Sequence, residues 1–221
     1  MSEYAVPSTP KKTTAEPNTA YLIASGDLRE SANLAGWPVQ QALEKHLTAA
    51  FEDLGWNVKR ANDVDPDLGH GFIRSQRMGL EVFKNIPEDA PLVIAEAVWQ
   101  YSHHVLAGLR THRGPILTVA NFAPDWPGLV GLLGLNAGMT KMGLSYSTTW
   151  SVDFTDQWFK DGIRSWVETG NIPHDTSHVR ALPELADSPE KQLGEAWQKN
   201  YSETRPSSAS SMKAAWGCTT R

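Results

Sequence analysis

Residues 115–138, PILTVANFAPDWPGLVGLLGLNAG, decide the fold of this chain. Their first part, 115–120, is a continuous apolar run, which is typical of a strand covered on both faces. The polar segment 121–126 then predicts a loop, and the apolar segment of roughly 129–142 predicts a helix. Pro127 suits the first turn of that helix, where its missing N–H costs nothing. Glycines recur there at three- and four-residue steps (128, 131, 134 and 138), so the helix can lie close to the sheet or to a neighbouring subunit.

The same strand–loop–helix pattern recurs along the chain. Further strands are expected at 21–25, 56–61, 91–97 and 144–149, and further helices at 39–54, 72–83, 102–112 and 156–169. Gly55 stops the first helix, and Asp156 is placed to cap the last one. Strands that alternate with helices predict a parallel sheet with right-handed crossovers. We therefore expect an α/β domain over residues 20–180, a three-layer, Rossmann-like or flavodoxin-like parallel sheet of about five strands.

Composition excludes several classes of protein. The chain has 221 residues, of which 40% are hydrophobic, a formal net charge of −5 and one cysteine, Cys218. A chain of this length can bury a core without disulfides, and a single cysteine predicts a reducing compartment. The first twenty residues lack the apolar segment of a secretory signal, and no apolar run approaches the ~18 residues of a membrane span. Because there is no basic block either, we expect a cytoplasmic protein with no membrane and no nucleic-acid partner.

The two ends of the sequence differ from its middle. Residues 1–19 are polar and rich in Thr, Pro and Lys, which predicts a disordered tail. Residues 181–205 are interpreted as the start of a connection to a second domain that is missing from this chain. The serine-rich residues 206–221 carry no fold signal.

The predicted fold by itself indicates where a ligand would bind, because ligands of such sheets bind beyond the carboxyl ends of the strands. Four loops begin there, at Gly26 (GDLRES), Asn62 (NDVDPD), Val98 (VWQYSHH) and Asn121 (NFAPDW). The first loop holds a single glycine, so it fits neither a dinucleotide fingerprint nor a P-loop. Its Arg29 is either a clamp for a hydroxyl or carboxylate group, or a solvated loop charge.

Aromatic residues in the third loop suit a polyol ligand, since the C–H faces of sugars pack on rings. They are Trp99 and Tyr101, and His103 and His104 follow as metal ligands, acid–base groups or exposed helix residues. His174 and His178 have the i, i+4 spacing of helical zinc sites. They lack the glutamate of that motif and follow a proline, so we interpret them as structural. The residues alone therefore predict a site location but no catalytic residue, no metal ligand and no reaction.

Several stretches taken together resemble the L-fucose/L-arabinose isomerase superfamily, specifically the fucose-isomerase-like proteins. They are GDLRES at 26–31, Trp99, GPIL at 114–117 leading through Asn121 to DWPGLV at 125–130, and WSVDFTD at 150–156. The resemblance covers roughly residues 20–180, and the four motifs occur in the family's order.

The resemblance implies an aldose–ketose isomerase that uses a divalent metal, usually Mn²⁺, and an ene-diol intermediate. It implies that Arg29 binds sugar hydroxyls, that Trp99 packs on the sugar, and that the loop containing Asn121, Asp125 and Trp126 shapes the pocket. The family's metal ligands come from later domains, so no metal is expected on this chain alone. The small-molecule partner is then a sugar, and the full-length protein is expected to be a homo-oligomer.

The carboxyl terminus suggests why those domains are missing. In this family an apolar strand and a segment such as DEGCMGMYN should follow, and the codons for Ser211–Thr220, read two bases later, are compatible with that segment. We therefore hypothesise that 206–221 is a frameshifted, non-native tail and that the chain is truncated and inactive alone. The alternatives are a genuine short tail and, for function, a stand-alone flavodoxin-like module that binds a small ligand or a partner. A flavodoxin-type cofactor binder is a third, less favoured possibility.

Overall fold

The computed structural model describes residues 14–98, 102–123, 125–126, 128–181 and 186–203. The chain divides at His174 into two units, residues 1–174 and 175–221. The first unit holds the whole sheet, and each unit is described by itself. Part of the predicted amino-terminal tail (1–13) and all of the predicted non-native tail (206–221) lie outside the described residues.

The first unit is built on one five-stranded sheet in which every pairing is parallel. Its strands are β1 (Thr19–Ile23), β2 (Asn57–Arg60), β3 (Leu92–Glu96), β4 (Ile116–Asn121) and β5 (Ser147–Ser151). They lie in the order β2-β1-β3-β4-β5, which is the flavodoxin-like order. The predicted three-layer α/β fold is confirmed.

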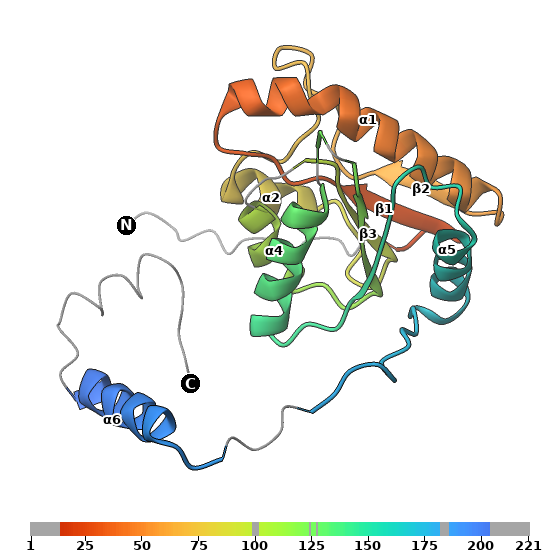
Figure 1. Cartoon of the computed structure of the whole chain (residues 1–221). Helices are drawn as coiled ribbons and strands as arrows, with labels where there is room; N and C mark the ends of the chain where they lie inside the picture. Colours follow the sequence, from red (N-terminus) through yellow and green to blue (C-terminus); the bar gives the residue numbers. More distant parts are fainter. Residues whose placement is uncertain (1–13, 99–101, 124, 127, 182–185, 204–221) are drawn as a thin grey trace, which may run out of the picture. The chain divides into compact units, whose positions relative to one another are not determined.

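Helices cover both faces of this sheet. They are α1 (Glu30–Glu52), α2 (Gln76–Phe83), the 3₁₀ turn η1 (Ser102–Val105), α3 (Leu106–Leu109), α4 (Gly128–Lys141) and α5 (Gln157–Thr169). Figure 1 shows α1 and α5 on one side of the sheet and α2 and α4 on the other.

Each face buries its own apolar cluster, because strand side chains alternate between the two faces. Val93 and Ala95 of β3 pack in one cluster with Phe51 of α1 and Trp166 of α5. Ile94, between them, packs in the other cluster, with residues of α2, η1, α3 and α4. The three middle strands are buried along their whole length, as the apolar runs at 91–97 and 115–120 predict.

The boundaries of two helices differ from the predicted ones for identifiable reasons. Helix α1 begins at Glu30 rather than near 39, and it carries Pro38 in its interior, a residue that sequence reasoning takes as a helix boundary. Helix α2 begins at Gln76 rather than 72, because the Ser75 hydroxyl accepts the Met78 N–H and caps the helix there. As predicted, α1 ends before Gly55, which adopts a left-handed φ of +74°.

The predicted helix over 102–112 is divided into η1 and the short α3. By contrast, the capping role predicted for Asp156 is confirmed. Its carboxylate accepts the Phe159 N–H at 2.8 Å and so satisfies the first turn of α5.

The described part of the second unit contains one helix, α6 (Pro189–Glu203). Leu193, Trp197 and Tyr201 recur along it at four-residue steps and are exposed. The last two rings stack at 5.4 Å between centroids. The interpretation of 181–205 as a connection to a further domain stays a prediction.

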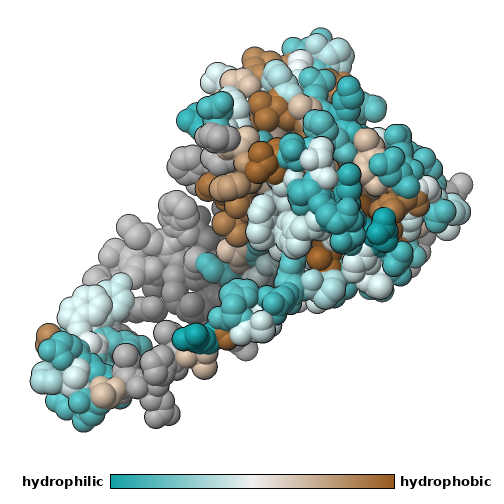
Figure 2. All heavy atoms as spheres, turned by 45° about the vertical axis from the view of Figure 1, so that its right-hand side comes forward, coloured by the Kyte–Doolittle hydropathy of each residue, from teal (hydrophilic) through white to brown (hydrophobic). Residues whose placement is uncertain are grey.

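No helix of the described residues is long and apolar enough to cross a membrane. On the face drawn in Figure 2, hydrophobic residues gather in a band within a largely hydrophilic surface.

Candidate functional site

The candidate site lies at the carboxyl edge of the sheet, beside β1 and β3. The strand order reverses there, since β2 lies on one side of β1 and β3 and β4 continue on the other. The helices that follow β1 and β3 therefore lie on opposite faces of the sheet, and open α/β sheets bind their ligands at such a switch point.

A closed loop after β1 holds Asp27 at this edge. The Asp27 N–H donates to the Asn33 side-chain oxygen at 2.8 Å, and the Asn33 amide donates back to the Asp27 carbonyl at 3.1 Å. Gly26 donates its N–H to the carbonyl of Ile73 at 2.7 Å, which ties the loop to the segment following β2. These hydrogen bonds fix the backbone of the loop at Gly26 and at Asp27.

Arg29 forms a two-pronged ion pair with this carboxylate. Its Nε and Nη2 donate to the two oxygens of Asp27 at 2.9 and 3.1 Å. The bond and the positive charge of Arg29 hold the pKa of Asp27 below its ordinary value. Asp27 is buried, whereas the Arg29 side chain is 73% exposed. The pair thus presents an oriented guanidinium to solvent at the carboxyl end of β1.

The loop after β4 is organised by Asn121, the last residue of that strand. Its amide Nδ2 donates to the Trp126 carbonyl at 3.0 Å, and its Oδ1 accepts the Gly128 N–H at 3.2 Å. Asn121 therefore closes the loop and caps the start of α4. Trp126 is half-buried against the apolar cluster that contains Phe51 of α1 and Trp166 of α5, and Asp125 is exposed. Asn121 was predicted as a site residue; it is buried, and its side chain holds the loop in shape.

Trp99 and Tyr101, in the predicted loop after β3, lie outside the described residues. The structure therefore brings Arg29 and the β4 loop to one edge of the sheet, and the predicted role of Trp99 stays a prediction. His104 is buried in η1, where its carbonyl lies against Gly79 of α2.

Two buried polar residues at this edge were missed by sequence reasoning. Glu96 ends β3 and is fully buried. Its signal was present, since it is the one charged residue of the apolar run 91–97. Gln40 of α1 is also fully buried; it donates to the Ala95 carbonyl at 3.2 Å and accepts the Ala97 N–H at 3.1 Å. No local pattern could reveal this contact of Gln40 with β3, because the two backbone groups that it binds lie more than fifty residues away.

A network under α1 supports the segment after β2. Arg60 donates to both oxygens of Glu44 at 2.7 and 2.9 Å and to the Gly71 carbonyl at 2.8 Å. Its guanidinium lies 5.1 Å above the ring of Trp37. These contacts hold the backbone that follows β2 against α1, beside the candidate site.

His70 adds a second attachment to α1. Its Nδ1 accepts the Phe72 N–H at 3.1 Å, so the neutral ring carries its proton on Nε2, which faces the carboxylate of Glu30. Glu30 directly follows Arg29, so the segment after β2 is attached to the first turn of α1, next to the loop after β1.

The turn after β5 places one residue in an uncommon backbone conformation. Phe154 is buried with φ at +63°, and its ring stacks on His46 of α1 at 5.7 Å. The Ser151 hydroxyl accepts the Phe154 N–H at 2.8 Å and donates to Asp156. Packing and these hydrogen bonds together offset the cost of the left-handed conformation.

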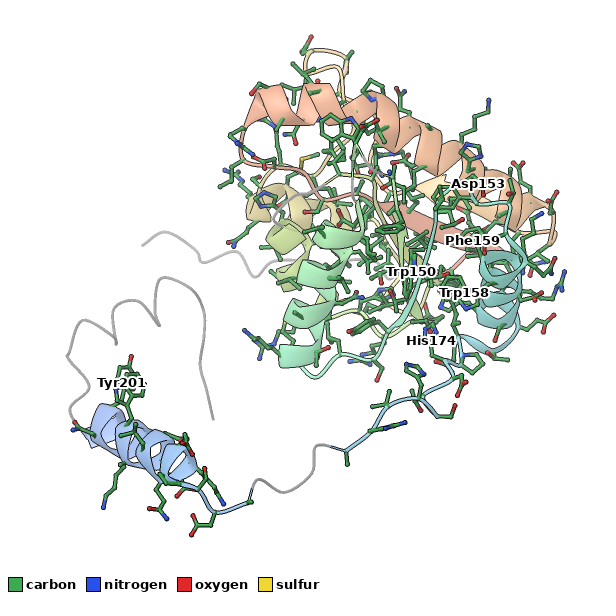
Figure 3. All side chains as sticks on the ribbon, in the orientation of Figure 1. Trp150, Asp153, Trp158, Phe159, His174 and Tyr201 are labelled. Atoms are coloured by element: carbon green, nitrogen blue, oxygen red, sulfur yellow. The ribbon has the colours of Figure 1, made fainter. Side chains whose placement is uncertain are left out.

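His174 has a structural contact, in keeping with the interpretation from the sequence. Its Nε2 lies 3.1 Å from the carbonyl of Thr148, on the outer edge of β5. Trp150, Trp158 and His174 lie side by side along this edge (Figure 3), with ring centroids 5.0 Å and 6.3 Å apart. Within the described ranges, no group of three or more His, Cys, Asp or Glu side chains is placed to hold a metal ion.

No protein-family model matches this sequence, and no curated protein or solved structure shows significant similarity to it.

Proposed function

We propose that the first unit is the amino-terminal, substrate-recognition domain of a sugar isomerase-like protein that interconverts an aldose and a ketose. The sugar would lie at the carboxyl edge of the sheet, beside the loops after β1 and β4. The observation that carries the proposal is the Arg29–Asp27 pair, which holds an exposed guanidinium where a flavodoxin-like sheet receives its ligand.

This arrangement suits neighbouring hydroxyl groups. A guanidinium offers several N–H donors in one plane, and two adjacent sugar oxygens can accept from its outer edge. Because Asp27 already fixes the orientation of Arg29, binding costs less side-chain entropy than it would with a mobile arginine. Trp126 and, by the family resemblance, Trp99 would pack against the apolar face of the sugar.

The chemical step is assigned to a different part of the full-length protein. In the intact enzyme, Mn²⁺ would polarise the sugar carbonyl and the adjacent hydroxyl. The described residues do not fit such an ion, since no suitable ligand group is placed among them. The part of this chain is to bind and orient the sugar, and we expect no turnover from it alone.

The strand order favours one alternative, a stand-alone flavodoxin-like module that binds a small ligand or a partner. Both functions place the ligand at the same edge, so binding alone does not separate them. The discriminating observation is whether adjacent coding sequence supplies the missing Glu, Asp and His domains. A flavin is disfavoured because the first loop, GDLRES, lacks a phosphate cradle rich in Ser, Thr and Gly, and an absorbance spectrum of the purified protein tests it.

Sugar titrations followed by NMR chemical shifts test the proposal. L-Fucose and L-arabinose are added separately to the wild-type chain, to Arg29→Gln and to Arg164→Gln. Arg164 is a matched control, because it is also exposed and also paired with a nearby aspartate, Asp161. We expect saturable binding of at least one sugar, about tenfold weaker in Arg29→Gln and unchanged in Arg164→Gln. Equal affinity in all three proteins would contradict the role of Arg29.

An activity assay tests the assignment of the chemistry. The purified chain is incubated with Mn²⁺ and either sugar, and the ketose product is measured. Robust turnover would show that the metal site lies within these 221 residues and would overturn the recognition-only role.

A further inference from the structure

A hollow of about 310 Å³ lies at the opposite edge of the sheet from the candidate sugar site. It is bordered by Pro115 and Ile116, where β4 begins, by Tyr146 and Ser147, where β5 begins, and by Asn171 after α5. In a parallel sheet, the starts of neighbouring strands share one edge, so this is the amino edge. Its volume reaches the lower end of the range typical of small-molecule sites.

The charge of this hollow differs from that of the chain as a whole. The formal net charge of the protein is −5, yet the residues that line the hollow include no aspartate or glutamate. They do include one cation, Arg113. Arg113 is exposed, and its guanidinium takes part in none of the ion pairs found among the described residues.

The walls are held in place by hydrogen bonds. The Tyr146 hydroxyl donates to the Asn136 carbonyl at 3.2 Å. The Ser147 hydroxyl donates to the Asn171 side-chain oxygen at 3.3 Å and accepts the Ile172 N–H at 3.0 Å. Because the Asn171 oxygen accepts from Ser147, its NH₂ group is the part of this amide left to donate to a ligand.

The lining also contains a buried histidine, His112, whose ring has an unfilled hydrogen-bonding position. Only 8% of the residue is exposed, and its Nε2 has no hydrogen-bond partner within the described residues. Phe83 contacts the same ring edge-on at 6.3 Å between centroids. The ring donates to the backbone of Ala90 from its other nitrogen, so Nε2 of the neutral ring is an acceptor, which a water molecule or another hydrogen-bond donor can satisfy.

We propose that this hollow binds a small oxyanion, the chemistry shared by a phosphate group and a carboxylate. The Arg113 guanidinium would supply the positive charge and a planar pair of donors. The Ser145 hydroxyl and the Asn171 amide would add neutral donors from the other walls. The lining itself has donors and no carboxylate, which favours an anion over a cation; the carboxylate of Asp89, whose charge acts on His112, lies outside the lining. This site is independent of the proposed sugar site, which lies at the other edge.

The experiment measures anion binding to the full chain at constant ionic strength. Inorganic phosphate and acetate are titrated separately into the protein in a buffer without other oxyanions, and binding is followed by calorimetry and by backbone amide shifts. Three variants are compared with the wild type: Arg113→Gln, Ser145→Glu, which adds a negative charge to the wall, and Arg110→Gln. Arg110 is an exposed arginine three residues away that does not line the hollow, so it is the matched control.

We expect saturable binding of at least one anion, with shifts confined to residues 112–116, 144–147 and 170–171. Affinity should fall about tenfold in Arg113→Gln and below detection in Ser145→Glu, and Arg110→Gln should match the wild type. Tighter binding of phosphate than of acetate points to a phosphorylated ligand, and the reverse to a carboxylic acid. Absence of saturable binding by both anions, or equal affinity in Arg113→Gln and Arg110→Gln, would overturn the proposal.

Discussion

Gly128 begins α4 directly against the backbone of Glu96, the last residue of β3. A Cβ atom built on Gly128 would lie 2.0 Å from the Glu96 carbonyl oxygen and 2.2 Å from the Asn121 side-chain oxygen. No side chain fits this space, so the helix can reach the strand end only with glycine at this position.

Substitution of this glycine should therefore destabilise the protein. Gly128→Ala forces α4 away from β3 and is expected to lower the free energy of unfolding by about 1–3 kcal/mol. Gly134, in the same helix, has open space around its Cα. Gly134→Ala should raise the free energy of unfolding by roughly 0.5–1 kcal/mol through helix propensity. Urea denaturation of both variants checks the contrast; similar effects would contradict the close approach at Gly128.

The partly buried pair of Arg60 and Glu44 is expected to lose stability even on a conservative replacement of the arginine. Arg60→Lys keeps the charge but loses the paired bonds to Glu44, so the free energy of unfolding should fall by about 1–3 kcal/mol. The exposed pair of Arg164 and Asp161 is the control, and Arg164→Lys should change stability by less than about 0.5 kcal/mol. Equal losses of stability in the two variants, measured by urea denaturation, would show that the paired bonds of Arg60 to Glu44 have no special role.

The Asp27 carboxylate should contribute to stability in a defined acidic range. Its pKa in the folded protein is lowered from 3.8, chiefly by Arg29, so the unfolded chain binds more protons as the pH falls below that value. The contribution is complete above the unfolded pKa and is lost as the pH falls through the folded one. Asp27→Asn should be less stable than wild type at about pH 6, with the difference narrowing toward about pH 2.5. Asp63→Asn, an exposed control, should show no such narrowing.

His112 should also make the protein less stable in acid, but at a higher pH than Asp27, because the ordinary pKa of histidine is 6.5. Burial holds its pKa below the ordinary 6.5, so the ring stays neutral in the folded protein where the unfolded chain is protonated. The free energy of unfolding should therefore fall as the pH drops below about 6.5. His112→Gln should show a smaller loss between about pH 7.5 and pH 5.5 than wild type, whereas the exposed His178→Gln should not. Identical pH slopes in wild type and His112→Gln would refute the assignment.

The sequence predicted those features that depend on short-range patterns. The apolar runs at 91–97 and 115–120 indicated covered parallel strands, and Asp156 indicated the start of α5. Gly128 belonged to a predicted close-packing stripe, but Gly134 of the same stripe faces open space. A repeat of glycines along a helix indicates that another element can approach it closely. Which of the glycines that element contacts is shown only by the packing.

The parts that could not be predicted depend on residues distant in the chain. Asn121 was expected to shape a pocket, but its bonds to Trp126 and Gly128 require the β4 loop to fold back on itself. The hollow at the amino edge of the sheet joins three segments, 112–116, 144–147 and 170–171, none of which carries a recognisable motif. Such sites exist only after the strands have been assembled side by side.

The ring of His174 on the Thr148 carbonyl has a consequence for how the protein behaves when crowded. The outer edge of a terminal strand is a template on which a second molecule can add a strand, and repeated addition builds fibrils. Here Trp158 and His174 lie along that edge, and one of its outward carbonyls already has a partner. An added strand could not bond to the Thr148 carbonyl while His174 occupies it, and a chain cut before His174 would leave that carbonyl open to such a strand.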